Sequence, residues 1–269
     1  MKEINLSQEY LRIAKKIKTL RIIRDIRELE NLENALYVFQ ENCKEILELF
    51  DYYYAGYLEK WIKLHNKKHD NFLLEFQRLF HNLLSSLFTL IEHSTVFKKQ
   101  INNEEFRHFY DDEVKKLISF KVTAFLKKLR IYCQHYKLPL LTSGRAKYLI
   151  SPDGKLLEHS RIGERIFFGR LAIPKDELRK WDGWSKDAKD FIEEYRFLFN
   201  SEIVASSDKI IDLHEVIKEY RKMVDDFYRL IRIKFKELHR DEIDEYIASE
   251  REVERIIDLM KDNPKFCVR

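Results

Sequence analysis

The sequence predicts a mainly α-helical protein: a helical bundle, a short β-hairpin or three-strand insertion near residues 145–173, and further helices. Glycine and proline, which cost a helix interior about 1 to 3 kcal/mol, are concentrated in one stretch. Residues 1–138 hold Gly56 and no proline, whereas residues 139–183 hold five of the six glycines and three of the four prolines. Apolar residues recur at helical spacing on both sides of that stretch. We expect a bundle, an insertion and C-terminal helices packed on the bundle as one unit, at residues 1–140, 141–175 and 176–269.

The first part of the chain is expected to be helical throughout. Two helices are predicted at residues 6–30 and 32–66, divided near Asn31. The next helix has apolar residues at three- and four-residue steps, a stripe that has to be buried. Its members are Leu73, Phe76, Phe80, Leu83, Leu84, Leu87, Leu90 and Ile91. A second stripe runs from Val114 to Tyr136, with Leu117, Ile118, Val122, Phe125, Leu126 and Leu129.

That second stripe stops at Leu138, because Pro139 disfavours helix in the residue before it. After Pro139 the apolar residues no longer recur at the three- and four-residue steps of a helix. Two apolar runs separated by Pro152, Asp153 and Gly154 predict a hairpin, since proline and glycine favour a turn there. The run RIFFGRLAI predicts a third strand.

Helix is expected to resume after Pro174. Ser185 is a candidate N-cap for a helix over KDAKDFIEEYRFLF. Asp212 and Glu215 resemble a capping box before a long helix that reaches about His239. A last helix is expected at about residues 242–261.

Composition narrows the class of function. No apolar run reaches the roughly 20 residues that a membrane span requires. The three cysteines are far apart and odd in number, which is typical of a reducing compartment and predicts a cytoplasmic protein without a disulfide framework. Fifty basic and 46 acidic residues nearly balance, so nucleic acid would have to be bound at a local patch.

The segment FLKKLRIYCQHYKLP is the most informative stretch for function. It places Arg130 and His135 near the end of a helix, beside the candidate RNA-binding residues Lys127, Lys128 and Lys137. The spacing resembles the signature of the HEPN superfamily, which is arginine, four to six residues and then histidine near a helix end. The preceding amphipathic helix is also similar, and the resemblance covers roughly residues 30–140.

The resemblance implies a metal-independent endoribonuclease without a cofactor, in a toxin–antitoxin or phage-defence system. His135 would move protons and Arg130 would stabilise charge on phosphoryl oxygens, with the RNA 2′-hydroxyl as the nucleophile. It also implies a homodimer, in which the motifs of two protomers meet, and an antitoxin or regulator as partner. The alternative is a non-catalytic helical module that binds RNA or protein. Ile131 favours it, because the family commonly has a polar residue there.

Three further points bear on this motif. On a regular helix Arg130 and His135 lie roughly 140° apart, which predicts that they do not share one face. A second arginine–histidine pair with loose spacing, Arg232 and His239, is expected to belong to a charged, solvated helix face. A surface-paired arginine and a helix-capping histidine are the structural alternative for Arg130 and His135.

Other candidate residues are weaker indications of a catalytic, metal or binding site. His65 and His69, with Asp70, have the spacing of a helical metal pair but lack the glutamate of a metalloprotease motif. Four cations spaced along one helix side are interrupted by acids and predict a salt-bridged surface. They are Lys18, Arg21, Arg24 and Arg27. The aromatics Tyr52, Tyr53, Tyr54, Trp181 and Trp184 are expected in the core, with base stacking as the alternative.

Overall fold

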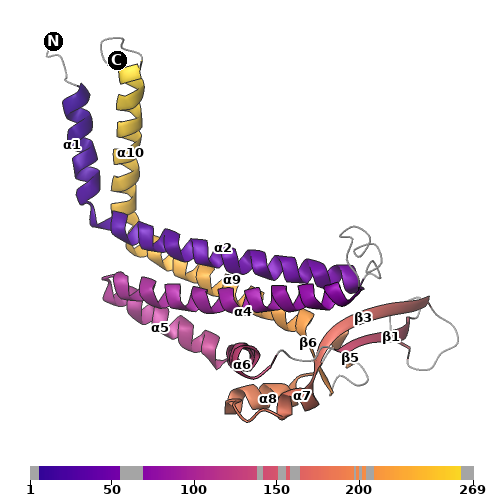
Figure 1. The fold of residues 1–269 in the computed structure, drawn as a ribbon. Coiled ribbons are helices and arrows are strands. Elements are labelled where there is room, and N and C mark those ends of the chain that lie inside the picture. Colours follow the sequence, from indigo (N-terminus) through magenta and orange to yellow (C-terminus); the bar gives the residue numbers. More distant parts are fainter. Residues whose placement is uncertain are drawn as a thin grey trace. The chain divides into compact units, whose positions relative to one another are not determined.

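The computed structural model describes residues 6–54, 69–137, 142–150, 156–157, 164–196, 198–199, 202–203 and 209–261. It confirms a mainly helical protein with a β insertion (Figure 1). The elements of the first half are α1 (Leu6–Thr19), α2 (Arg21–Tyr54), α4 (His69–Gln100), α5 (Glu104–Ser119) and α6 (Lys121–His135). Those of the second half are β1 (Thr142–Ile150), β2 (Leu156–Leu157), β3 (Glu164–Pro174), α7 (Lys175–Arg179), α8 (Lys186–Glu194), β4 (Leu198–Phe199), β5 (Glu202–Ile203), β6 (Ile210–Asp212), α9 (Leu213–Leu238) and α10 (Arg240–Lys261). No described helix is long and apolar enough to cross a bilayer.

The chain divides into two compact units, each built from segments distant in sequence. Unit 1 comprises Met1–Asn34, His93–Asp111 and Tyr228–Arg269, and unit 2 comprises Ala35–Glu92 and Asp112–Phe227. Each unit contains segments from both sides of residue 140. The packing of the three predicted segments as one unit therefore stays a prediction.

Unit 1 has an aromatic core and an ion pair between its first and last helices. The rings of Phe97, Phe106 and Phe235 lie 5.6 to 6.3 Å apart. Helix α1 packs along α10, and the Lys16 ammonium lies 2.7 Å from the Glu245 carboxylate. Such contacts between remote segments bury apolar surface that no single helix could bury alone.

The predicted helix boundary near Asn31 is wrong. The break falls at Leu20, and α2 continues through Asn31 to Tyr54. Leu29, Leu32 and Leu36 are all buried, so one apolar stripe spans the asparagine, whose helix propensity is only modestly unfavourable. Residues 55–66 of the predicted second helix lie outside the described residues.

The predicted core helix is observed as α4, and its apolar stripe lies in unit 2. Its stripe is buried from Phe76 to Leu90, but Ile91 is 39% exposed, so its predicted place in the core is wrong. The side chain of Leu73 lies outside the described residues. The stripe from Val114 to Tyr136 belongs to two helices rather than one.

The break between α5 and α6 lies at Phe120, whose backbone is extended (φ −75°, ψ 126°). The hydroxyl of Thr123 donates to the Leu117 carbonyl at 2.8 Å, and such local hydrogen bonds compete with helical ones. Helix α6 then buries the apolar positions that the pattern assigns to the core, Val122, Phe125, Leu126 and Leu129, whereas Ile118 on α5 is 61% exposed.

The β insertion is an antiparallel sheet with strand order β2-β1-β3-β6. Strand β1 pairs with β2, with Leu149 opposite Leu157, and with β3, from Thr142 opposite Ala172 to Ile150 opposite Glu164. The predicted hairpin and third strand are thus confirmed, and the turn residues 152–154 lie outside the described residues. The sequence does not predict strand β6 or the small β4–β5 hairpin, because strands of two or three residues show no readable alternation.

The C-terminal helices agree closely with prediction. Ser185 does precede α8, although its side chain makes no capping hydrogen bond, and α8 ends at Glu194 rather than near Phe199. The carboxylate of Asp212 accepts a 3.3 Å hydrogen bond from the backbone N–H of Glu215, which confirms the predicted cap of α9. Helices α9 and α10 follow within about two residues of the predicted bounds.

Candidate functional site

Helix α6 separates its apolar and basic residues onto two faces. Val122, Phe125, Leu126, Leu129 and Tyr132 are buried. The motif and its neighbours occupy the opposite side, where Lys127, Gln134 and His135 are exposed and Lys128, Arg130 and Ile131 are half-buried. We call this side the basic face of α6.

The basic face includes both motif residues. At about 100° per residue, Lys127 and Gln134 lie between Arg130 and His135 around the helix axis. The separation of roughly 140° therefore spans one solvent-facing sector, with Arg130 at one border and His135 near the other. The two residues thus lie at opposite borders of this sector, as expected from their predicted separation.

Arg130 is held by an aromatic ring. Its guanidinium carbon lies 3.4 Å from the centroid of Phe88 on α4, a cation–π contact. Its Nε is buried and has no hydrogen-bond partner among the described residues. Among the described residues no carboxylate lies within ion-pair distance of this guanidinium, so the alternative of a surface-paired arginine is not observed there.

His135 lies in the last turn of α6 and is exposed to solvent. The Tyr132 carbonyl accepts hydrogen bonds from the backbone N–H groups of Tyr136, at 2.9 Å, and Lys137, at 3.1 Å. The helix end is thus closed by backbone groups, and no hydrogen bond from the imidazole to a described residue is observed.

The predicted lysines differ in availability. Lys127 and Lys128 have no described carboxylate within ion-pair distance. The Lys137 ammonium lies 2.8 Å from the Glu177 carboxylate, which also pairs with Lys180. Hydrogen bonds from these two lysines lower the pKa of Glu177 to about 2, and the bond to Glu177 raises the pKa of Lys137. Two cations on one carboxylate leave that site with net positive charge.

An aromatic cluster lies beside the end of α6. Tyr132 is fully buried among the rings of Tyr136, Trp181 and Trp184, with centroids 5.1 to 5.6 Å away. Its hydroxyl has no hydrogen-bond partner within the part of the chain that the structure describes, and burial raises its pKa to about 12. Trp184 is buried and its indole N–H donates to the Leu178 carbonyl at 2.7 Å, which confirms the core assignment for that residue.

Two residues of this region do not stand out in the sequence: Phe88 and Tyr136. Phe88 lies at a helical position beside the apolar stripe of α4 and shows no distinguishing pattern. Tyr136 is 49% exposed even though it belongs to the apolar stripe that the sequence predicts. The one sequence signal for it is an aromatic residue next to a basic motif at a helix end.

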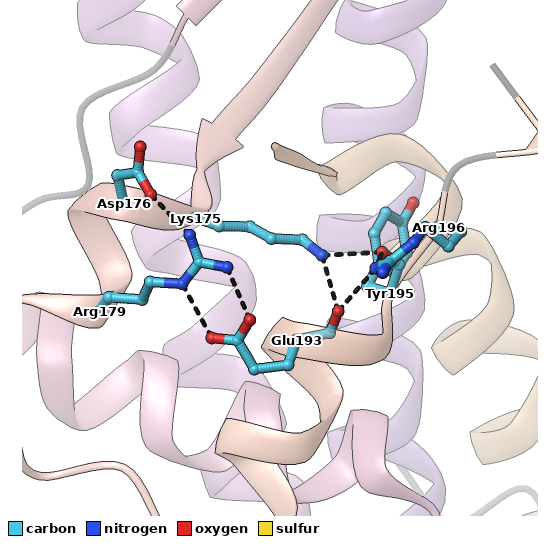
Figure 2. A network of polar contacts seen from close by, with 6 residues as sticks. All are labelled: Lys175, Asp176, Arg179, Glu193, Tyr195 and Arg196. Carbon is cyan, nitrogen blue, oxygen red and sulfur yellow. Dashed lines mark hydrogen bonds and ion pairs between the residues drawn. The ribbon is translucent and has the colours of Figure 1, made fainter. Parts of the chain in front are cut away.

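A polar network anchors α7 to the end of α8 (Figure 2). The fully buried Lys175 ammonium donates to the carbonyls of Glu193, at 3.3 Å, and Tyr195, at 2.8 Å. Arg196 donates to the same two carbonyls. Arg179 forms a bidentate pair with the Glu193 carboxylate at 2.6 and 2.8 Å. The cations satisfy carbonyls left free at a helix C-terminus. The network therefore holds α7, which carries Glu177, and α8, and these two helices lie on either side of the connection that contains both tryptophans.

The second arginine–histidine pair has a structural role. Arg232 lies 3.9 Å from Glu33, as expected for a charged surface. His239 is only 8% exposed, packs 4.7 Å from the Phe235 ring and contacts Glu242 through Nδ1 at 2.5 Å. The solvated-face prediction is therefore wrong for His239, because the α9–α10 junction buries its imidazole.

Among the remaining candidates, the described residues form no reactive centre. His65 and the side chains of His69, Asp70 and Tyr52 to Tyr54 lie outside the described residues. Within the described ranges no group of three or more histidine, cysteine or acidic residues could hold a metal. Of the basic stripe, Arg24 pairs with buried Asp25 at 3.3 Å, in line with a salt-bridged surface.

His214, which the sequence does not highlight, lies between two carboxylates. Its Nδ1 is 3.1 Å from Glu215 and its Nε2 is 3.4 Å from Asp51. The contact joins the end of α2 to the start of α9 within unit 2.

No family model, curated protein or solved structure matches this chain. The choice among functions therefore depends on the chemistry of α6 and its surroundings.

Proposed function

We propose that this chain is a metal-independent endoribonuclease that acts as a homodimer through the basic face of α6. The observation that carries the proposal is the basic face itself. Its two motif residues border one solvent-facing sector, and Lys127 and Lys128 are free of described carboxylates. The matching HEPN-like spacing of Arg130 and His135 is the second support.

The proposed roles follow from the side chains. An exposed imidazole can take a proton from the RNA 2′-hydroxyl or give one to the leaving oxygen near neutral pH. A guanidinium fork suits the charge that develops on phosphoryl oxygens in the transition state. Lys127 and Lys128 would contact neighbouring phosphates. No metal or cofactor is required by these steps.

A second protomer would complete the site. Arg130 and His135 of one chain are separated by the width of the basic face, and no hydrogen bond joins them. Two α6 helices facing each other across a two-fold axis would place the arginine of one chain near the histidine of its partner. The dimer is therefore part of the proposal.

The second candidate is a non-catalytic helical module that binds RNA or protein. Ile131, an apolar residue directly after Arg130, favours it. So does the packing of Arg130 on Phe88, which occupies one face of the guanidinium. A toxin–antitoxin or phage-defence role, an antitoxin or regulator as partner, and a cytoplasmic site of action extend the first proposal.

The experiment compares RNA cleavage by the purified chain with that of Arg130→Ala and His135→Ala. Each should lower the cleavage rate by about 100-fold or more, the usual effect of losing an acid–base group or an oxyanion contact. The matched controls are His81→Ala, an exposed histidine of α4, and Arg232→Ala. Both should cleave like the parent.

Cleavage that persists unchanged in both motif variants would rule out the site. Absence of cleavage by the parent, with retained RNA binding, would select the second candidate. Light scattering under the same conditions tests the dimer, and a monomer that cleaves RNA would remove the composite site.

A further inference from the structure

We propose that Tyr136 stacks on the base of an unpaired nucleotide in RNA that extends from the basic face of α6 past the end of that helix. This inference rests on the proposed RNA contact, and it does not depend on cleavage. It assigns a base-recognition residue to the site and makes unpaired RNA the preferred ligand.

Tyr136 is the first residue after α6 and directly follows His135. Its backbone is fixed by the hydrogen bond from its N–H to the Tyr132 carbonyl. Its side chain is 49% exposed, whereas Tyr132, one turn earlier, is fully buried. A base bound at Tyr136 would therefore lie next to the proposed proton-transfer group.

The exposed ring is supported from behind. The Tyr132 ring centroid lies 5.1 Å away, and that ring packs in turn on Trp181 and Trp184. Trp181 is itself confined, since a Cβ at Gly183 would lie 2.2 Å from its indole. A ring already fixed by such packing loses little conformational entropy when a ligand stacks on it.

A cation further restrains the ring. The Lys137 ammonium lies 5.7 Å from the Tyr136 centroid, and Glu177 holds that ammonium at 2.8 Å. Glu177 is shared with Lys180, so this corner carries net positive charge despite the carboxylate. A polyanion is not repelled from it.

The aromatic surface at the end of α6 and the cations on the same helix together identify the class of ligand. Tyr136 follows Tyr132 by four residues and therefore lies on the apolar side of α6, about 180° around the helix axis from Lys127. A single strand that runs from Lys127 and Lys128 past the end of the helix could place phosphates on the lysines and stack a base on Tyr136, which is how single strands are bound without sequence preference. A duplex hides the faces of its bases, so only an unpaired nucleotide can use both features. A protein partner would match the tyrosine but leave the two lysines without phosphates.

The test measures fluorescence anisotropy of a labelled single-stranded RNA of about 12 nucleotides, and of the same strand in a duplex. All proteins carry His135→Ala to prevent cleavage. Adding Tyr136→Leu should raise the Kd for the single strand about tenfold and leave the duplex Kd unchanged. Tyr136→Phe, which keeps the ring, should bind like the parent. Tyr37→Leu, at a 62% exposed tyrosine of α2, is the matched control and should also bind like the parent.

The outcomes separate the two proposals. Unchanged single-strand affinity in Tyr136→Leu overturns the stacking inference and leaves the RNA-binding proposal standing. An equal loss for single strand and duplex also overturns it. No RNA binding by the parent overturns both. A 2-aminopurine base whose fluorescence is quenched by the parent and by Tyr136→Phe, but not by Tyr136→Leu, supports stacking independently of affinity.

Discussion

Replacing Arg130 with methionine should remove activity without lowering the stability of the fold. Arg130 stacks on Phe88 at 3.4 Å and buries an Nε without a described hydrogen-bond partner. Methionine keeps an unbranched side chain over the ring and removes both the charge and the unsatisfied nitrogen. If Arg130 contacts RNA and does not stabilise the fold, the substitution should leave the free energy of unfolding unchanged and remove activity.

The change in the free energy of unfolding follows from three contributions, one unfavourable and two favourable. Loss of the cation–π interaction costs about 0.5 to 2 kcal/mol, and a sulfur–aromatic interaction restores about 0.3 to 1.5 kcal/mol of it. Removal of a buried, unpaired donor gains about 1 to 3 kcal/mol. The expected free energy of unfolding is unchanged or about 1 kcal/mol higher, which corresponds to a rise in Tm of about 2 to 4 °C.

Thermal unfolding followed by circular dichroism measures the first half of this prediction, and RNA cleavage or binding measures the second. Arg130→Lys is the matched control, because it keeps the charge and loses the planar fork. It should recover RNA binding more fully than cleavage. A loss of stability greater than about 2 kcal/mol in Arg130→Met, or full activity in that variant, would refute the functional role of Arg130.

Three further predictions concern charge and burial. Lys127→Ala combined with Lys128→Ala should weaken RNA binding and reduce the slope of log Kd against log salt by about 0.7 for each phosphate that the lysines no longer neutralise; an unchanged slope would exclude both lysines from the interface. Glu177 has a folded-state pKa of about 2, below its ordinary value, so its ion pairs stabilise the fold above about pH 4.5 and are lost as the pH falls towards 2. Glu177→Gln should accordingly flatten acid unfolding in that range, and an unaltered profile would contradict the pairing. Burial raises the pKa of Cys43 to about 12, so its thiol should resist alkylation at about pH 8 until the protein is unfolded; mass spectrometry that finds rapid native labelling would contradict its burial.

Long elements are predicted well from the sequence, and short or interrupted ones poorly. Helix α4 can be located because its stripe repeats over several turns, and α9 because Asp212 marks its start. Ile91 is misassigned because spacing shows which positions share a face but not how wide the buried face is. The break at Phe120 escapes prediction because no glycine or proline marks it.

The candidate site is predictable only in part. The sequence places Arg130 and His135 on one helix, with Lys127 between them around its axis. It does not show that Phe88, on the preceding core helix α4, lies under the guanidinium, because such contacts depend on tertiary packing. The exposure of Tyr136 is likewise hidden, since the cluster that buries Tyr132 is completed by Trp181 and Trp184 from a later segment.

The most direct measurement is crosslinking of the protein to RNA that contains 4-thiouridine, followed by mass spectrometry of the crosslinked peptides. If the basic face of α6 binds RNA, crosslinks should concentrate on peptides from residues 127–137, with Tyr136 among the modified positions. They should decrease when Lys127 and Lys128 are replaced by alanine. Crosslinks confined to other helices, with none on that segment, would contradict the assignment of this face as the RNA site.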